Sequence, residues 1–332
     1  MDKVWGRVIA ALIMGVLLPR LVLSAGLWLT AVESPEPIQT VPGETEHSLP
    51  SIEMAVPVPV YIPVLTGQMD VEVMELENYV LGVVLAEMPA AFSPEALKAQ
   101  AIVARTYALR RIHQADRHGG GAVCIDSSCC QAYISKENYL KSRGTEGDVQ
   151  IIRQAVEATH GLVLMYGDTL VEATYFSCSG GRTEEALEVW GSDLPYLKAL
   201  DSPGEESAVN YCTRICFTPA DFTKALGARL AGDPAAWFGK TTYTAGGGVK
   251  TMIIGSTSYS GTQLRQLLGL NSTRFTVTVE NKTILVETQG KGHRVGMSQY
   301  GADAMAAVGH NYSEILGYYY PGTVIDKVGE IG

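Results

Sequence analysis

Residues 79–107 read YVLGVVLAEMPAAFSPEALKAQAIVARTY, and this stretch contains two helix patterns separated by a short break. In the first pattern, apolar residues recur at helical spacing from Leu76 to Val84. We expect this helix to end at Met88, because a residue that precedes proline disfavours the α region. The second pattern begins at Ser93-Pro94-Glu95, an N-cap residue followed by a proline and an acid suited to a first helical turn. The stretch therefore predicts two consecutive helices with Glu87 at the end of the first.

Outward from this stretch, helix and strand patterns are mixed without a repeating β–α–β order. Strands are expected within 60–75, with a break at Thr66-Gly67, and a helix is expected over 150–160. Further along, the patterns predict strands at 162–165, 170–176 and 274–288, a turn at Asn281-Lys282, and short helices at 298–308 and 313–320. This mixture predicts an α+β fold with a single domain over residues 60–328.

The N-terminus carries a targeting signal. Two apolar runs within residues 1–32 are together long enough to cross a bilayer, and Lys3 and Arg7 before them predict that the N-terminus stays inside. Arg20 interrupts the apolar runs, and a charge near the middle of a bilayer is costly. A signal peptide cleaved near Ala25 is therefore the alternative to a single-pass anchor. Both interpretations export the rest of the chain and place it at the cell membrane or beyond.

Composition indicates a linker and limits the kinds of molecule that the protein is expected to bind. Residues 33–59 are rich in Pro, Glu, Ser and Thr and are predicted to be a linker. The formal net charge of the 332 residues is −10, which argues against a general nucleic-acid binder because such a protein needs clustered Lys and Arg. A neutral polysaccharide fits this balance better.

Three further segments complete the motifs. They are CIDSSCCQAY at 124–133, YFSCSGGRTEEALEVW at 175–190 and GKGHRVGMSQYGA at 290–302. Together with 79–107 they resemble the stage II sporulation protein D family, also called the SpoIID/LytB domain, over about residues 60–325. This resemblance implies a peptidoglycan lytic transglycosylase at work in spore engulfment. It further implies substrate strands that an amidase partner has stripped of stem peptides, and contacts with other engulfment proteins.

Glu87 occupies the position of the family's catalytic acid. Its apolar neighbours Leu85, Met88 and Phe92 favour the protonated carboxyl group and so raise its pKa. Hydrolytic glycosidases usually need two carboxylates. In a lytic transglycosylase the nucleophile is instead the C6 hydroxyl of N-acetylmuramic acid. The resemblance thus implies that Glu87 first protonates the glycosidic oxygen and then accepts the hydroxyl proton, which yields a 1,6-anhydro sugar without a cofactor.

The resemblance also implies a substrate groove. Lys98 and Arg105 are seven residues apart and share a helix face, which a solvated basic face would explain equally well. Trp190 and Tyr196 are candidates to stack on sugar rings, although buried aromatic residues are common. For Gln100 the alternative is a packing role, and for Ser177 and Ser179 it is a plain loop. For His293 the alternative is a histidine satisfied within its loop. The predicted substrate-binding residues are Lys98, Gln100, Arg105, Ser177, Ser179, His293 and Gln299.

The cysteines leave several possibilities open. His118, Cys124 and Cys130 are spaced six residues apart, and some clostridial relatives carry a zinc site with these ligand types at this place. A structural zinc is therefore expected, with Cys129 as a competing ligand. The alternatives are a Cys124–Cys130 disulfide, a disulfide that contains Cys129, or free thiols. Cys212 and Cys216 are candidates for a local disulfide.

Two other functions remain open at this level. LytB-type relatives are regarded as non-catalytic amidase enhancers that bind peptidoglycan. A hydrolytic muramidase would need a second carboxylate, for which Asp201 and Glu172 are available without motif support.

Overall fold

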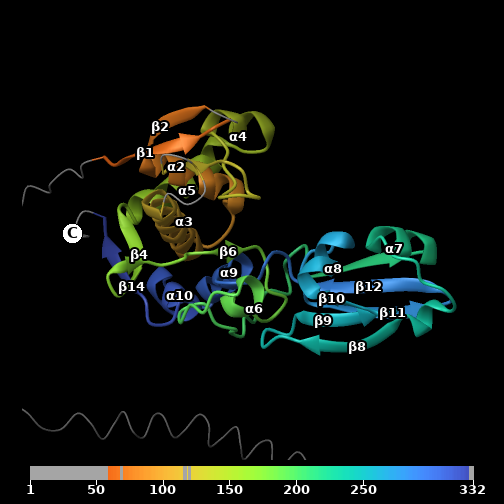
Figure 1. The fold of residues 1–332 in the computed structure, drawn as a ribbon. Coiled ribbons are helices and arrows are strands. Elements are labelled where there is room, and N and C mark those ends of the chain that lie inside the picture. Colours follow the sequence, from red (N-terminus) through yellow and green to blue (C-terminus); the bar gives the residue numbers. More distant parts are fainter. Residues whose placement is uncertain (1–58, 68–69, 115–117, 119–120, 329–332) are drawn as a thin grey trace, which may run out of the picture. The chain divides into compact units, whose positions relative to one another are not determined.

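The computed structural model describes residues 59–67, 70–114, 118 and 121–328, which belong to one compact unit (Figure 1). The predicted anchor or signal peptide at 1–32 and all but the last residue of the predicted linker lie outside the described residues. Within the described part of the chain, no helix is both long and apolar enough to span a membrane.

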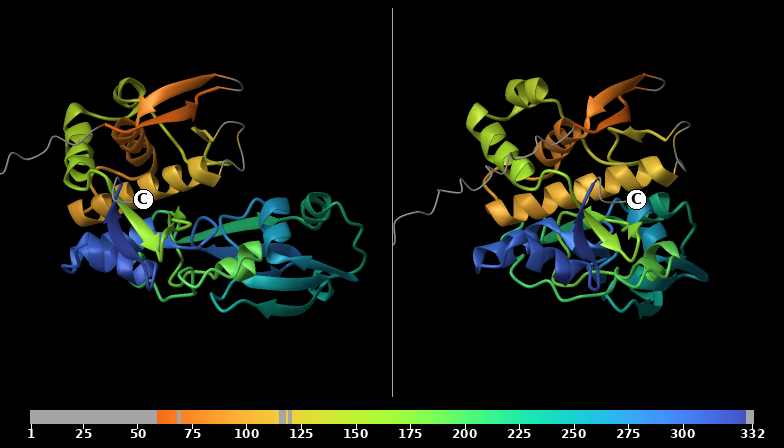
Figure 2. Two further views of the ribbon diagram at one scale, coloured as in Figure 1. Left: turned by 60° about the vertical axis from the view of Figure 1, so that its left-hand side comes forward. Right: turned by 90° about the vertical axis from the view of Figure 1, so that its left-hand side faces the viewer.

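Helix α3 (Pro94–Gln114) is central to the larger hydrophobic core. It packs against α2 (Leu76–Glu87), α5 (Glu146–Ala158), α9 (Gln299–Ala307) and α10 (Tyr312–Tyr319). Figure 2 shows α3 lying between α2 and the C-terminal helices in both views. Its sequence permits this because small residues let the backbones of neighbouring helices approach closely. The fully buried alanines are Ala96, Ala99, Ala101, Ala104 and Ala108.

The end of α2 follows the prediction. Met88 is the C-cap residue and is extended, with φ −126° and ψ 140°, as expected for a residue before proline. The short helix α4 (Lys136–Ser142) follows later in the chain and packs on α2. The two helices predicted from residues 79–107 are confirmed.

Short strands surround this core. The hairpin of β1 (Tyr61–Leu65) and β2 (Val71–Glu75) pairs with β3 (Val123–Cys124). Strand β4 (Leu162–Tyr166) lies between β5 (Thr169–Leu170) and β14 (Val324–Lys327). Strand β6 (Tyr175–Phe176) pairs in parallel with β13 (Met297–Ser298). This last pairing brings the third and fourth motif segments side by side.

A second hydrophobic cluster forms around Phe222 in residues 212–289. One sheet contains β8 (Phe238–Tyr243), β9 (Val249–Ile254) and β10 (Thr257–Ser260), and another contains β7 (Cys212–Phe217), β11 (Phe275–Glu280) and β12 (Thr283–Gln289). The helical pieces are α7 (Pro219–Leu226), a 3₁₀ turn η1 (Pro234–Ala236) and α8 (Gly261–Leu267). Asn281 and Lys282, with φ of 49° and 64°, form the predicted turn between β11 and β12.

The architecture is thus a mixture of helices and small, mainly antiparallel sheets, in agreement with the mixed class predicted. Two expectations need correction. The helix predicted at 150–160 begins at Glu146, after a capping box that Thr145 forms with Asp148. The strand predicted at 170–176 is two short pieces, β5 and β6.

Candidate active site

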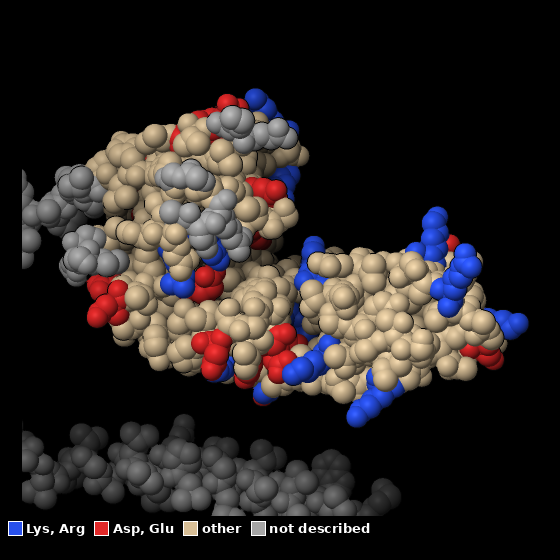
Figure 3. Space-filling model, viewed as in Figure 1, with Lys and Arg blue, Asp and Glu red and all other residues tan. Residues whose placement is uncertain are grey.

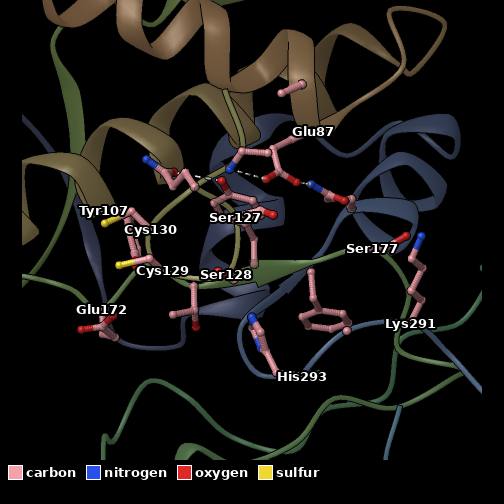
Figure 4. Close-up of a pocket in the computed structure, with 18 of the residues that line it drawn as sticks. Glu87, Tyr107, Ser127, Ser128, Cys129, Cys130, Glu172, Ser177, Lys291 and His293 are labelled. Atoms are coloured by element: carbon pink, nitrogen blue, oxygen red, sulfur yellow. Dashed lines mark hydrogen bonds between the residues drawn. The ribbon is translucent and has the colours of Figure 1, made fainter. Parts of the chain in front are cut away.

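A cleft of about 760 Å³ contains Glu87 at the end of α2 (Figure 4). One wall comes from the loop 127–132, and other parts come from α3, β6, the loop 291–293 and the first residue of α9. All four motif segments therefore contribute to one cavity.

Both oxygens of Glu87 accept hydrogen bonds. The Ala132 amide donates to Oε1 and the Gln299 amide nitrogen donates to Oε2, each at 3.2 Å. Burial raises the pKa of Glu87, and these two hydrogen bonds oppose part of that effect because they stabilise the carboxylate. The group is thus suited to give up a proton in the cleft and to be stabilised once it has done so.

The Ala132 donor is placed by close packing on α2. Gly82 accepts a hydrogen bond from the Ile134 amide at 3.1 Å. A Cβ atom on Gly82 would lie 2.2 Å from the ring of Tyr133, so only glycine permits this approach. The loop is held against α2 by these contacts, and Ala132 reaches Glu87 as a result.

The last turn of α2 has a side-chain cap. Arg143 donates through Nη2 to the carbonyls of Leu85 and Ala86, at 3.0 and 3.2 Å. These carbonyls precede Glu87, and a cation here favours the negative end of the helix dipole.

Tyr175 is a neutral hydroxyl close to the acid. Its hydroxyl donates to Oε1 of Gln131 at 2.9 Å. Burial, and then the negative charge of Glu87, raise the pKa of Tyr175 well above its ordinary value. The hydroxyl therefore stays protonated beside Glu87.

His293 lies on the opposite side of the cleft beside an aromatic platform. Its ring is 5.1 Å from that of Trp190 and 5.7 Å from that of Phe176. Its Nδ1 accepts a hydrogen bond from the Val295 amide at 3.2 Å, and burial and the charge of Arg265 lower its pKa to about 4. His293 is therefore neutral near pH 7, and Trp190 beside it is 44% exposed and lines the cleft.

A second cluster of polar side chains borders the same cleft. His118, Cys124, Cys129 and Cys130 each offer a ligand atom, and these four atoms lie within 4.8 Å of one another. One imidazole and three thiols are a donor set that suits tetrahedral zinc. Cys129 and Cys130 also line the cleft, so the cluster forms part of one of its walls.

Comparison with known proteins bears directly on this site. The family model described as "SpoIID: Stage II sporulation protein" matches residues 66–166. The chain is 42% identical over 275 residues to stage II sporulation protein D of Bacillus subtilis (strain 168), which covers 81% of this chain and 80% of that protein. The chain belongs to the SpoIID family. It is also 39% identical over 290 residues to the protein of the same name from Bacillus amyloliquefaciens, with 86% and 83% covered.

A more distant relative carries a different name. The protein "Amidase enhancer" of Bacillus subtilis (strain 168) is 31% identical over 300 residues, which span 74% of this chain and 40% of that protein. SpoIID-type sequence therefore also occurs within longer proteins.

Four of the predicted substrate-contact and acid residues meet in the cleft: Glu87, Ser177, His293 and Gln299. Arg105 does not, and the prediction for it is corrected. It is fully buried, pairs with Glu77 at 2.5 Å and donates to the Leu162 carbonyl at 2.9 Å. Arg105 therefore ties α3 to α2 and β4.

Lys98 and Gln100 also lie away from the cleft lining. Lys98 forms an ion pair with Glu95 at 2.6 Å, one turn earlier on the exposed side of α3. Gln100 is fully buried in the core, where neither side-chain polar atom has a hydrogen-bond partner among the described residues. Seven-residue spacing correctly places Lys98 and Arg105 on similar faces, but it does not distinguish a groove from the core.

Ser179 belongs to an internal anion site. Glu205 accepts hydrogen bonds through Oε2 from the Ser179 amide at 2.9 Å, the Ser179 hydroxyl at 2.7 Å and the Gly180 amide at 2.9 Å. The serine–glycine turn thus wraps a carboxylate of its own chain, and only Ser177 of the two predicted serines lines the cleft.

The candidate local disulfide is also corrected. Cys212 and Cys216 lie on the same strand, β7, four residues apart. At about 3.3 Å per residue they are separated by about 13 Å, well beyond disulfide reach.

Proposed function

We propose that this SpoIID-family protein is a peptidoglycan lytic transglycosylase. Its substrate would be the bond between N-acetylmuramic acid and N-acetylglucosamine in peptide-stripped glycan strands, during spore engulfment. The observation that supports this most directly is the isolation of Glu87. Of the two carboxylates among the described residues that line the cleft, only Glu87 is outside an ion pair.

The reaction needs one proton-transfer group. Protonated Glu87 donates its proton to the glycosidic oxygen as that bond breaks, and the carboxylate then takes the proton of the C6 hydroxyl. The C6 oxygen bonds to C1, which closes a 1,6-anhydro ring and leaves Glu87 protonated again. Hydrogen bonds from Ala132 and Gln299 stabilise the carboxylate between the two steps.

A hydrolytic muramidase fits the cleft less well. Glu172 lines the cleft, but Arg110 pairs with one of its oxygens at 3.0 Å and Arg111 with the other. Asp201 lies outside the cleft lining, is 74% exposed and pairs with Arg182. An inverting hydrolase needs a second carboxylate to activate water, and a retaining hydrolase needs one as the nucleophile. The ion pairs of Glu172 and the position of Asp201 outside the cleft lining disfavour both roles.

The amidase-enhancer function remains a second candidate because of the relative that carries this name. Such a protein would bind the glycan and stimulate an added amidase without cutting the strand itself. The raised pKa of Glu87 in a cleft lined by a neutral histidine and an exposed tryptophan favours the enzyme.

Digestion of peptide-free glycan strands tests the proposal. The full-length protein should shorten the strands, and Glu87→Gln should abolish cleavage because an amide has no acidic proton to give. Glu137→Gln, at an exposed position on α4, is the matched control and should cleave normally. Cleavage by folded Glu87→Gln protein would refute the assignment.

We also propose that zinc occupies the His118 and cysteine cluster and has a structural role. The metal would fix the loop that presents Ala132 to Glu87, and no step of the reaction passes through it. Protein purified without added metal should contain about one zinc per chain. The Cys124→Ser/Cys130→Ser variant should lose the metal, whereas Cys212→Ser/Cys216→Ser should keep it. Metal-free protein with a Cys124–Cys130 disulfide in peptide maps would contradict this.

For its location, we propose an N-terminal membrane anchor with the catalytic domain outside the cytoplasm. The apolar runs of residues 1–32 and the preceding Lys3 and Arg7 support this. The exported protein should fractionate with membranes and retain its N-terminus. A mature N-terminus near Ala25 would instead show a cleaved signal peptide. The partners would be glycan strands, a peptidoglycan amidase and other engulfment proteins.

A further inference from the structure

The cleft contains an uncompensated positive charge. Of the lysine and arginine side chains among the described residues that line it, Arg111 pairs with Glu172. The ammonium of Lys291 makes no ion pair or hydrogen bond with any described residue, and Lys291 is exposed. Figure 4 shows Lys291 and Glu172 at opposite sides of the cleft, with Glu87 between them.

The backbone of Lys291 is held firmly. Its amide donates to the Cys178 carbonyl at 2.7 Å, and the Cys178 amide donates back at 3.1 Å. Gly290 and Gly292, on either side, have φ of 79° and 115°, a region that favours glycine. A Cβ atom on Gly290 would lie 2.7 Å from the Cys178 carbonyl oxygen. The lysine is therefore presented to the cleft from a loop with little freedom to move.

A second cation lies near the same wall. Arg265 of α8 is half-buried, and its guanidinium makes no ion pair or hydrogen bond with the rest of the described chain. Its positive charge acts on His293, two residues after Lys291. The wall formed by residues 291–293 therefore lies in a positive field, because neither Lys291 nor Arg265 pairs with a described carboxylate.

This field matters because the protein as a whole is acidic. Its net charge is −10, and acidic and basic side chains are both scattered over the face drawn in Figure 3. An anionic strand is repelled at long range by such a protein, so its charged groups need a local partner. Peptide-free N-acetylmuramic acid carries a free lactyl carboxylate. When a stem peptide is attached, the same carbonyl is a neutral amide.

We propose that Lys291 forms a carboxylate subsite that binds the free lactyl group of N-acetylmuramic acid in the cleft. Lys291 is then a specificity-determining residue that distinguishes stripped strands from strands that still bear peptides. The inference rests on the proposed function for the identity of the sugar. Its test measures binding rather than cleavage, so that either proposal can be refuted without the other.

The test measures binding to full-length protein purified in detergent, in a Glu87→Gln background that does not consume the ligand. The two probes are a peptide-free glycan oligosaccharide and the same oligosaccharide with its lactyl carboxylates converted to methylamides. Protein with Lys291 should prefer the carboxylate form by about tenfold, the size of one charge-assisted hydrogen bond. The preference should shrink as salt is added.

Variants at Lys291 and at a control lysine test whether the preference for the carboxylate probe depends on Lys291. Lys291→Gln should bind both probes equally, and Lys291→Arg should retain the preference because it keeps the charge. Lys240→Gln, at an exposed lysine of β8 outside the cleft lining, should behave as the parent. Equal binding of both probes by the parent, or an unchanged preference in Lys291→Gln, would overturn the inference.

The two proposals fail in different ways. Cleavage of both oligosaccharides at equal kcat/KM by the protein with Glu87 intact would leave the enzyme in place and remove the subsite. A clear carboxylate preference in binding without any cleavage would keep the subsite and remove the enzyme.

Discussion

At the scale of single residues, the chemistry of Glu87 depends on a balance of two effects. Burial favours its neutral form, whereas the hydrogen bonds from Ala132 and Gln299 favour its charged form. Burial prevails, so the pKa is raised. A group that acts first as an acid and then as a base needs both effects, because each supports one half of the reaction.

Gln299→Leu tests this balance through pH. The side-chain hydrogen bond of Gln299 lowers the pKa of Glu87, so its loss should raise that pKa further. Because the first step needs protonated Glu87, kcat/KM should fall as pH rises through this pKa. The alkaline limb of the pH profile should therefore move to higher pH in the variant, whatever happens to the maximal rate. An unchanged limb, or a limb at lower pH, would show that Gln299 does not set the pKa of the acid.

At the scale of elements, α3 supports the site. Neither Lys98 nor Arg105 of this helix lines the cleft. The guanidinium of Arg105 donates to both oxygens of Glu77, and Glu77 also accepts from the Gly161 amide at 3.2 Å. One side chain of α3 thus connects α2, which ends at Glu87, to β4 through the Leu162 carbonyl.

Arg105→Met should therefore reduce stability and leave the chemistry intact. Removing one partner of a buried ion pair leaves the other charge without a partner, which lowers the free energy of unfolding by about 3–5 kcal/mol. Chemical denaturation followed by circular dichroism measures this. The exposed Arg229→Met is the control and should change stability by less than about 0.5 kcal/mol. Normal stability with lost cleavage would instead return Arg105 to the substrate groove.

The sequence predicts the elements of the motif segments well, because local signals determine them. Proline after Met88, Pro94 at the first position of α3 and the Asn281-Lys282 turn all act within a few residues. The site is predicted less completely. Whether Arg105 faces a groove or Glu77 depends on a residue 28 positions away, and spacing along one helix contains no such information.

Other parts of the site have weak signals in the sequence. Tyr175 and Gln131 lie inside quoted motif segments, yet nothing local shows that they meet beside Glu87. The Ser179 turn is typical of a ligand-binding loop, but Glu205, further along the chain, fills it. The sequence of the turn alone does not show that Glu205, rather than an external ligand, accepts its hydrogen bonds.

At the scale of the whole described unit, a buried arginine joins the regions that contain the two hydrophobic clusters. Arg294 donates to the Ser179 carbonyl at 2.9 Å, to the Gly246 carbonyl at 2.6 Å and to Glu184 at 3.2 Å. Gly246 belongs to the connection between β8 and β9, so this side chain links the second cluster to the motif loops. The φ of Arg294 is 67°, a glycine-like conformation that turns the chain between His293 and Val295.

Such long-range contacts help residues that are far apart in the sequence, from Glu87 to Gln299, to line one cleft. The pairing of β6 with β13 aligns two of the walls, and the cluster of His118 and three cysteines borders a third. The cleft thus combines an acid at the end of α2 with a wall at residues 291–293 that carries both a neutral histidine and an unpaired lysine.

The mass of the products distinguishes a lytic transglycosylase from a hydrolase and from an amidase enhancer. Full-length protein is incubated with peptide-free glycan strands, and the new ends are identified by mass spectrometry. If the C6 hydroxyl held near C1 is the nucleophile, proximity favours intramolecular attack over water, and the ends must be 1,6-anhydro sugars. Each is lighter than a hydrolytic reducing end by one water. Spectra dominated by ordinary reducing ends, or intact strands alongside stimulation of an added amidase, would contradict the account.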